Sequence, residues 1–255
     1  MWTDLGGDGP VLAAFHGAEG SWQEWEPLAL RLRDRYRVFA ADLPWRASGG
    51  HAWRAERAPG TVISRALDAL PARPHAIAAH SFGANAVLEH LADGGARDVT
   101  GVVLLAPFYR DPRRSVDDLL RQDFVAVFRY AVLDGLRVAL AARGRLLDGQ
   151  LLETMADLAL KRVGDAGIDV LYRQFVETTS LSLATVEVPA LVLVGDEDPA
   201  LSADRAGFLA QAMPSARVDR RPHYTHCCHV RQADDVAARL VGFLRVTEHR
   251  KVHQP

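Results

Sequence analysis

The sequence predicts an α/β fold, with a mostly parallel, doubly wound sheet and a helical region inserted late in that sheet. Three observations predict this class. Short apolar runs alternate with longer amphipathic runs, which is typical of a parallel sheet covered by helices on both faces. No strand candidate occurs between residues 111 and 185. Finally, a serine lies between an apolar run and a helix-like run, in the pattern of a tight strand–helix turn.

The short apolar runs are predicted to be strands and the amphipathic runs between them helices. The chain has 255 residues, 49% of them hydrophobic, which is enough to bury the core of one large domain. Strands are expected at residues 11–15, 37–41, 76–79, 102–105, 191–194 and 216–218. Helices are expected at residues 25–36, 61–70, 83–92, 203–212 and 234–246. Few residues precede Gly6, so the first hairpin is short, and whether the sheet keeps its edge strand stays open.

The region between the strand ending near Ala106 and the strand starting near Ala190 is predicted to be all-helical. Apolar residues recur there at three- and four-residue spacings, which indicates helices at 115–134, 135–142, 149–162 and 168–178. Such an insertion between two parallel strands is a candidate lid. The alternative is that these helices only pack on one face of the sheet. The predicted domains are a core, residues 1–110 and 186–255, and a lid, residues 111–185.

The run Ala79-His80-Ser81-Phe82-Gly83 matches a nucleophile elbow, in which a serine lies at the turn from a strand into a helix. The turn is so tight that small residues are required two positions before and two positions after the serine. Ala79 stands where glycine is commoner, and alanine still fits. The strained turn would hold the Ser81 hydroxyl at a helix N-terminus, whose amides favour developing negative charge. The alternative is an ordinary strand–turn–helix with a chance serine.

The sequence also offers an acid for such a serine. A serine hydroxyl is a poor nucleophile at neutral pH, so it needs a histidine to take its proton and an acid to orient that histidine. The loop after the strand at 191–194 carries three carboxylates, of which we choose Asp198, because a turn at Gly195 would aim this position inward. Asp111, which follows the preceding strand, is the reserve candidate. In isolation, this loop would be interpreted as merely solvated.

Three histidines in the loop before the last predicted helix could supply the base. These are His223, His226 and His229, and we choose His226. The other two are expected to be surface or packing histidines. A metal site built from His226 and His229 has no supporting carboxylate or cysteine spacing, so no metal and no other cofactor is expected.

An oxyanion hole needs two backbone N–H donors near the serine. One would be the amide of Phe82, directly after Ser81. The other would come from the loop that begins His16-Gly17-Ala18, where glycine lets the backbone approach a carbonyl closely and the Ala18 amide would be the donor. The alternative is an ordinary glycine-rich turn. All these groups follow predicted strands, whose carboxyl ends converge on one edge of a parallel sheet.

Taken in chain order, these motifs resemble the α/β-hydrolase fold superfamily over nearly the whole chain, from Gly6 to about Val246. The closest resemblance is to cap-bearing esterases, cofactor-free haloperoxidases and carbon–carbon bond hydrolases. It rests on His16-Gly17, Asp42-Leu43-Pro44, the elbow run, Gly195-Asp196-Glu197-Asp198 and Thr225-His226. The resemblance implies a nucleophile, acid and base at Ser81, Asp198 and His226, oxyanion donors at Ala18 and Phe82, and a cap at residues 111–185.

The walls of the site are expected to come from the loop after the first strong strand, the turn after Asp42-Leu43-Pro44 and the cap. The residues expected to contact the substrate are His16, Gly17, Trp22, Trp45, Phe108, Phe124 and Phe128. Such walls suit a small, largely apolar or aromatic acyl compound. Aromatic residues on cap helices are also common in cores, so this alternative stays open.

The functional prediction is a serine hydrolase of the ester-hydrolase class, similar to carboxylesterases and working through an acyl-enzyme. A different chemistry on the same residues is an alternative. Lyases, carbon–carbon hydrolases and cofactor-free oxygenases that resemble this chain use the histidine–acid pair as a base without an acyl-enzyme. A small-molecule binding or receptor protein is a further alternative, because a fold does not determine a function.

The composition limits the partners. A formal net charge of -2 offers no electrostatic case for nucleic acid or for an anionic membrane. The chain has no basic-then-apolar signal segment, and no apolar run approaches the ~20 residues of a membrane span. Cys227 and Cys228 are adjacent, which disfavours a disulfide framework. We expect a cytoplasmic monomer or homodimer that acts on a small-molecule substrate.

Overall fold

The computed structural model describes residues 1–141, 144 and 148–252, which form a seven-stranded sheet in the order β1-β3-β2-β4-β5-β6-β7. The β1–β3 pair is antiparallel, and the other neighbouring strands are parallel. The strands are β1 (Trp2–Asp4), β2 (Val11–Phe15), β3 (Arg37–Ala41), β4 (Ala76–His80), β5 (Gly101–Leu105), β6 (Ala190–Gly195) and β7 (Ala216–Arg221).

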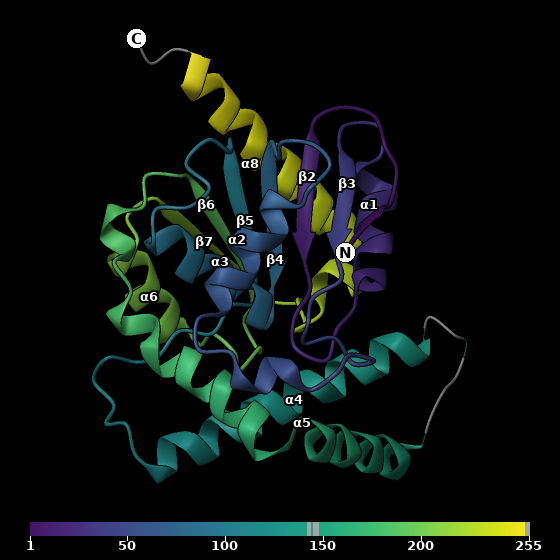
Figure 1. Ribbon diagram of the computed structural model, residues 1–255, viewed down its shortest axis with the longest axis vertical. Coiled ribbons are helices and arrows are strands. Elements are labelled where there is room, and N and C mark those ends of the chain that lie inside the picture. Colours follow the sequence, from purple (N-terminus) through teal and green to yellow (C-terminus); the bar gives the residue numbers. More distant parts are fainter. Residues whose placement is uncertain (142–143, 145–147, 253–255) are drawn as a thin grey trace.

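Helices cover both faces of the sheet (Figure 1). One face carries α1 (Glu26–Leu32) and α8 (Ala233–Val252), and the other carries α2 (Pro59–Asp68), α3 (Ser81–Ala92) and α6 (Ala203–Ala212). Side chains alternate between the two layers. In β4, Ala76 and Ala78 pack with α1 and α8, whereas Ile77 and Ala79 pack with the opposite layer. Because both faces are buried, the strands are continuous apolar runs in the sequence.

The parallel register brings the ends of four neighbouring strands to one edge of the sheet. Phe15 pairs with Ala79, His80 pairs with Leu105, and Leu105 also pairs with Leu193. The loops that follow β2, β4 and β6 therefore leave the sheet at the same edge, as predicted for the carboxyl ends of parallel strands.

Two long helices, α4 (Asp118–Ala141) and α5 (Gly149–Glu177), form the insertion between β5 and β6. They pack against each other and lie across one end of the sheet rather than on its faces (Figure 1). Four shorter helices were predicted. Gly135 does not interrupt α4, and the predicted end at residue 142 lies outside the described residues. The break expected between residues 162 and 168 is a kink at Gly164, which has a φ of 65° inside α5.

Other differences from the predicted elements are local. The edge strand that the sequence left open exists, since β1 pairs with β3 from Trp2 to Asp4. The first predicted helix is shorter, because the chain turns after Leu32 to enter β3. The short helices are η1 (Trp22–Trp25), η2 (Ala52–Ala55), η3 (Thr178–Ser180), η4 (Leu183–Thr185) and α7 (Cys228–Arg231). Within the described ranges, no helix is both long and apolar enough to cross a bilayer.

Candidate active site

Ser81 lies at a strained turn, as the first residue of α3 directly after β4. Its φ of 51° is in the left-handed region that non-glycine residues rarely adopt. The atoms around this turn leave no room for a side chain larger than glycine at positions 83 and 17. A Cβ at Gly83 would collide with the backbone oxygen of His16, and one at Gly17 would lie 2.9 Å from Cβ of Ser81. Ala79 is fully buried in β4 and is accommodated.

Ser81, His226 and Asp198 form one hydrogen-bonded chain. The Ser81 hydroxyl lies 2.9 Å from Nε2 of His226, and Nδ1 of that ring lies 3.0 Å from Oδ2 of Asp198. Because a carboxylate only accepts, Nδ1 donates to Asp198, which leaves Nε2 free to accept from the serine. The other oxygen of Asp198 accepts from the amide of Ala200 at 2.9 Å. The side chains of Ser81, His226 and Asp198 are all buried.

The charges and hydrogen bonds around His226 favour a basic imidazole ring. Burial lowers the pKa of His226, but the charge of Asp198 and its hydrogen bond outweigh burial, so the pKa of His226 is raised. Burial raises the pKa of Asp198, but the charge and hydrogen bond of His226 and the Ala200 amide outweigh it, so the pKa of Asp198 is lowered. Asp198 is therefore ionised at neutral pH, and His226 is suited to accept a proton.

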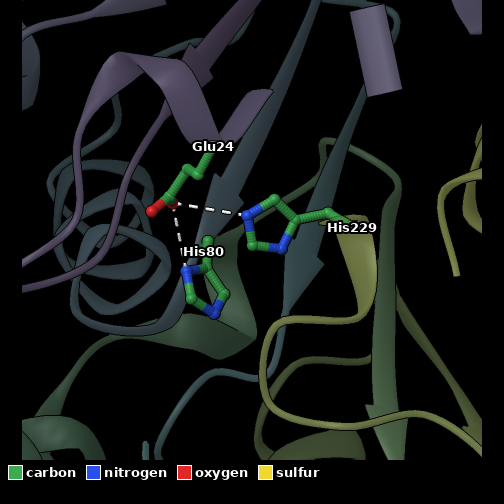
Figure 2. Close-up of side chains that lie close together, drawn as sticks. All are labelled: Glu24, His80 and His229. Atoms are coloured by element: carbon green, nitrogen blue, oxygen red, sulfur yellow. Dashed lines mark hydrogen bonds and ion pairs between the residues drawn. The ribbon is translucent and has the colours of Figure 1, made fainter. Parts of the chain in front are cut away.

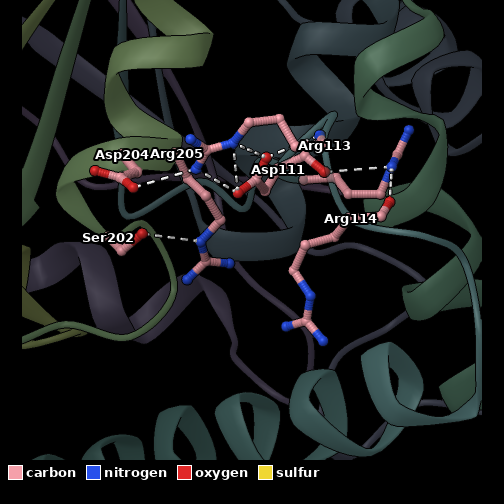
Figure 3. Close-up of polar contacts among 7 residues, drawn as sticks. Asp111, Arg113, Arg114, Ser202, Asp204 and Arg205 are labelled. Carbon is pink, nitrogen blue, oxygen red and sulfur yellow. Dashed lines mark hydrogen bonds and ion pairs between the residues drawn. The ribbon is translucent and has the colours of Figure 1, made fainter.

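The reserve acid, Asp111, lies in a different cluster (Figure 3). Its carboxylate pairs with Arg113 at 2.8 Å, and Arg113 also contacts Asp204 at 3.2 Å. The hydrogen bond from Arg113 lowers the pKa of Asp111 to about 2. Since Nδ1 of His226 is already bound to Asp198, Asp111 is excluded as the orienting acid in this structure.

His16 holds loops together instead of facing the substrate space. Its Nδ1 donates to the backbone oxygen of Gly17 at 2.8 Å, and its Nε2 accepts from the amide of Leu43 at 3.0 Å. Burial lowers the pKa of His16, which agrees with a neutral ring in this arrangement. Trp45 donates from Nε1 to the backbone oxygen of His16 at 3.1 Å. This network supports the loop that carries Ala18.

Two cavities meet at Ser81. The larger, of about 580 Å³, also reaches His226, Gly17 and Ala18, and helices α4 and α5 supply much of its wall. The smaller, of about 10 Å³, is lined mainly by aromatic and amide side chains, namely Phe82, Asn85, Phe108, Phe124, Phe128, Gln174 and Phe175, with Leu171. Phe128 borders both cavities.

The predicted substrate contacts divide into two groups. Gly17, Phe108, Phe124 and Phe128 line a cavity beside Ser81. His16, Trp22 and Trp45 line neither cavity, which corrects the expectation for these three residues. Trp22 packs instead against the core under α1 and α8, and the ring of Trp45 packs edge-on against Phe82 at 4.9 Å.

Sequence reasoning missed a second buried group, formed by Glu24, His80 and His229 (Figure 2). One ligand atom from each lies within 4.8 Å of the other two, so this group could hold a metal ion. His229 was expected to be a surface or packing histidine, and no role was predicted for His80 or Glu24. These residues are far apart in the chain and have no diagnostic spacing, so only the folded arrangement reveals the group.

Comparison with known proteins gives a family and a fold. A model described as the Alpha/beta hydrolase family matches residues 11–239. A bacterial membrane phospholipase A is 20% identical, with a TM-score of 0.72 over 97% of this chain and 82% of that chain. A bromoperoxidase from Bacillus anthracis is 20% identical, with a TM-score of 0.67 over 96% and 94%. An esterase from Exiguobacterium antarcticum is 15% identical, with a TM-score of 0.66 over 96% and 94%. No curated protein matches the sequence significantly.

Proposed function

The chain belongs to the alpha/beta hydrolase family, and we propose that it is a serine hydrolase that cleaves a carboxylic ester, or a related acyl bond, of a small and largely apolar substrate. The observation that carries this proposal is the hydrogen-bonded chain from Ser81 through His226 to Asp198, which opens at Ser81 into a cavity. An activated serine, an orienting acid and a space for substrate are the parts that acyl transfer needs.

In the first step, Oγ of Ser81 forms a bond to the carbonyl carbon of the substrate. The hydroxyl proton passes to Nε2 of His226, and the carbonyl oxygen becomes an oxyanion. The backbone amides of Phe82 and Ala18 would donate to that oxyanion. Phe82 lines the smaller cavity beside Ser81, and Ala18 lines the larger one. Asp198 stabilises the imidazolium that His226 becomes.

In the second step, the tetrahedral intermediate collapses and the bond to the leaving oxygen breaks. The proton on Nε2 of His226 passes to that oxygen, which leaves as an alcohol. An acyl group remains on Ser81. A water molecule then attacks the acyl carbon while His226 takes one of its protons, and collapse returns that proton to Oγ. The products are an acid and an alcohol, and the enzyme is restored.

The positions of the cavities support an orientation for the substrate. The leaving oxygen receives its proton from His226, and His226 lines the larger cavity but not the smaller. The alcohol part would therefore occupy the cavity of about 580 Å³, and the acyl part would occupy the aromatic cavity of about 10 Å³. A space of this size holds about one water molecule, so we expect an acyl group close to acetyl in size.

Residues 111–185 are proposed to act as a lid. Helices α4 and α5 supply apolar wall residues to the larger cavity, among them Phe128, Val132 and Leu136. Arg162 of α5 also pairs with Glu19 in the loop after β2 that carries Ala18. A helical wall joined to the loop by few polar contacts can open to admit substrate and close to exclude water.

The test is hydrolysis of p-nitrophenyl esters of increasing acyl length by the wild type, Ser81→Ala and His226→Ala. Turnover by the wild type alone, with an initial burst of p-nitrophenol equal to the enzyme concentration, supports the proposal. Equal turnover by Ser81→Ala would contradict it. If a fluorophosphonate labels Ser81 but no ester reacts, the site is formed for another chemistry or for binding, and the serine hydrolase proposal fails.

A further inference from the structure

A group of two histidines and one carboxylate lies beside the larger cavity and takes no part in the proposed reaction (Figure 2). Glu24 comes from η1, His80 from the end of β4 and His229 from α7. Their side chains are 17%, 6% and 0% exposed. Glu24 and His80 also line the cavity that reaches Ser81. The group is therefore held firmly within the fold, yet a small ion in the cavity can reach it.

The ligand atoms of the three side chains are spaced as a single metal ion requires. Oε1 of Glu24 lies 3.2 Å from Nδ1 of His80 and 3.4 Å from Nε2 of His229. Zinc binds imidazole nitrogen and carboxylate oxygen at about 2.0–2.2 Å in a tetrahedron, which separates neighbouring ligand atoms by roughly 3.4 Å. Both distances from Glu24 fit this value, and one ligand atom from each residue lies within 4.8 Å of the other two.

The hydrogen bonds of His80 leave its Nδ1 without a donor. Nε2 lies 3.0 Å from the backbone oxygen of His226, which only accepts, so Nε2 carries a hydrogen. Burial and the neighbouring His229 lower the pKa of His80 further than Glu24 raises it, to about 4, which agrees with a neutral ring. Nδ1 then presents a lone pair to the carboxylate of Glu24, and two such acceptors repel unless a cation lies between them. Histidines that bind metals typically donate their other N–H to a carbonyl or carboxylate, as His80 does.

His229 is fully buried without satisfying its ring nitrogens. Among the residues that the structure describes, neither nitrogen of this ring has a hydrogen-bond partner, because the 3.4 Å approach of Nε2 to Glu24 lacks hydrogen-bond geometry. Buried polar atoms are normally paired, so an unpaired one calls for an explanation such as a bound ion. The ring packs against Trp25 with 4.9 Å between centroids, which holds Nε2 toward Glu24.

The loop after β2 leaves room on the cavity side of this group. A Cβ at Gly17 would lie 3.1 Å from Nδ1 of His80, and a Cβ at Gly20 would collide with Oε2 of Glu24. Both glycines line the larger cavity together with the two ligand side chains. Three protein ligands with a fourth position open to a cavity are typical of accessible zinc sites.

We propose that Glu24, His80 and His229 bind one Zn²⁺ ion, with the fourth coordination position facing the larger cavity. The ion binds Oε1 of Glu24, Nδ1 of His80 and Nε2 of His229, and so joins η1, β4 and α7. His80 in turn donates to the backbone of His226, so the ion stabilises the loop that carries this histidine. The sequence predicts no metal, because the three ligands are far apart in the chain and have no diagnostic spacing.

Two variants remove a ligand, and one serves as the control. Glu24→Gln keeps the shape of the side chain, and its amide can donate to the lone pair of His80, so the fold is retained without the ion. His229→Asn removes Nε2. His75→Asn is the matched control, because His75 is a partly buried histidine that pairs with Glu248 at 2.8 Å, next to the start of β4 and away from Ser81.

The first measurement is the zinc content of protein that has been stripped with EDTA, given one equivalent of Zn²⁺ and desalted. Inductively coupled plasma mass spectrometry counts the ions retained. We expect about one Zn²⁺ per chain in the wild type and His75→Asn, and less than about a tenth of that in Glu24→Gln and His229→Asn. Weak binding by surface histidines would be shared by all four proteins, so it cannot produce this difference.

The second measurement is thermal unfolding with and without Zn²⁺. Isothermal titration calorimetry on the wild type first gives the Kd. At a free Zn²⁺ concentration about 100 times this Kd, the Tm of the wild type and His75→Asn should rise by roughly 5–10 °C. The Tm of Glu24→Gln should change by less than about 1 °C, because the ion no longer binds the folded chain tightly.

Two results would overturn the zinc site. The first is a wild type that retains no Zn²⁺ after loading. The second is equal retention by the wild type and Glu24→Gln, which would assign the ion to other residues. If Glu24→Gln does not fold, His229→Asn and the loading of the wild type still decide. Neither measurement needs activity, so if no ester is cleaved but zinc binds as expected, the proposed function fails and the zinc site stands.

Discussion

The side chain of Asn85 clamps the backbone of Phe108 with two hydrogen bonds. Nδ2 of Asn85 donates to the oxygen of Phe108 at 2.8 Å, and Oδ1 accepts from its amide at 2.8 Å. Asn85 lies one helical turn after Ser81, and Phe108 follows β5 where the chain leaves the sheet for the insertion. This pair therefore joins α3 to the start of the insertion, and both residues border the smaller cavity.

Replacing Asn85 should destabilise the protein strongly. Asn85→Ala leaves a buried amide and a buried carbonyl of Phe108 without partners, at a cost of about 2–4 kcal/mol in the free energy of unfolding. Asn85→Asp keeps the shape but cannot donate to the carbonyl, so we expect an intermediate loss at neutral pH. Urea unfolding measures both. A loss below about 0.5 kcal/mol in Asn85→Ala would show that the clamp contributes little.

Asp198→Asn should lower kcat about 10³- to 10⁴-fold, because the neutral amide neither holds the correct tautomer of His226 nor stabilises its charged form. Asp111→Asn is the control, since Asp111 is bound to Arg113 and not to His226. That variant should keep kcat within about twofold, as expected for a surface ion pair. A reversed order of the two effects would reassign the acid to Asp111.

The acid side of the pH profile should depend on Asp198. Burial lowers the pKa of His226, but the charge and hydrogen bond of Asp198 raise it above its ordinary value. We expect kcat/KM to rise with pH as neutral His226 forms, with a midpoint above the ordinary value of about 6.5. Asp198→Asn removes the two largest causes of the raised pKa of His226, whereas burial and the weaker effects of Asp134 and Glu24 remain, so the midpoint of the residual activity should move to lower pH. An unmoved midpoint would mean that the profile reports another group.

Enlarging the smaller cavity should change the preferred acyl length. Phe124 is buried at the border of this cavity, with its ring stacked against Phe175 at 5.1 Å. Phe124→Ala should shift the optimum from acetyl toward longer acyl groups, by at most ~0.8 kcal/mol, or roughly fourfold in kcat/KM, per added CH₂. Phe243→Ala, which removes the same ring beside a separate cavity under α8, is the control. An unchanged acyl profile would place the acyl group elsewhere.

The contact between Arg162 and Glu19 should restrain the proposed lid. Nε of Arg162 in α5 donates to Oε2 of Glu19 at 3.0 Å, which links the insertion to the loop after β2. Arg162→Gln should speed amide exchange in the first half of α5 by up to about fivefold, which corresponds to ~1 kcal/mol for a partly exposed pair. Arg31→Gln is the control, because it breaks an exposed ion pair with Asp234 between α1 and α8. It should leave amide exchange in α5 unchanged.

Much of the fold was readable from local sequence. The strands at residues 11–15 and 37–41 were predicted with their observed bounds, because each is a short apolar run buried on both faces. The helix at residues 203–212 was also predicted as observed. Gly135 was taken as a helix boundary, yet α4 continues through it. A glycine costs a helix about 1 kcal/mol, and the buried contacts of the neighbouring Ala131, Val132 and Leu133 outweigh that cost.

The sequence by itself determined the order of strands and helices and the position of Ser81 at a tight turn, because periodicity and small residues act over a few neighbours. Only the tertiary structure decided which histidine and which acid join that serine. Ser81 and His226 are 145 positions apart, and they meet because parallel strands bring their carboxyl ends to one edge. The same long-range packing buried Trp45, packed the partly buried Trp22 against the core and brought Glu24 to His80, since side-chain surroundings depend on segments that are distant in the chain.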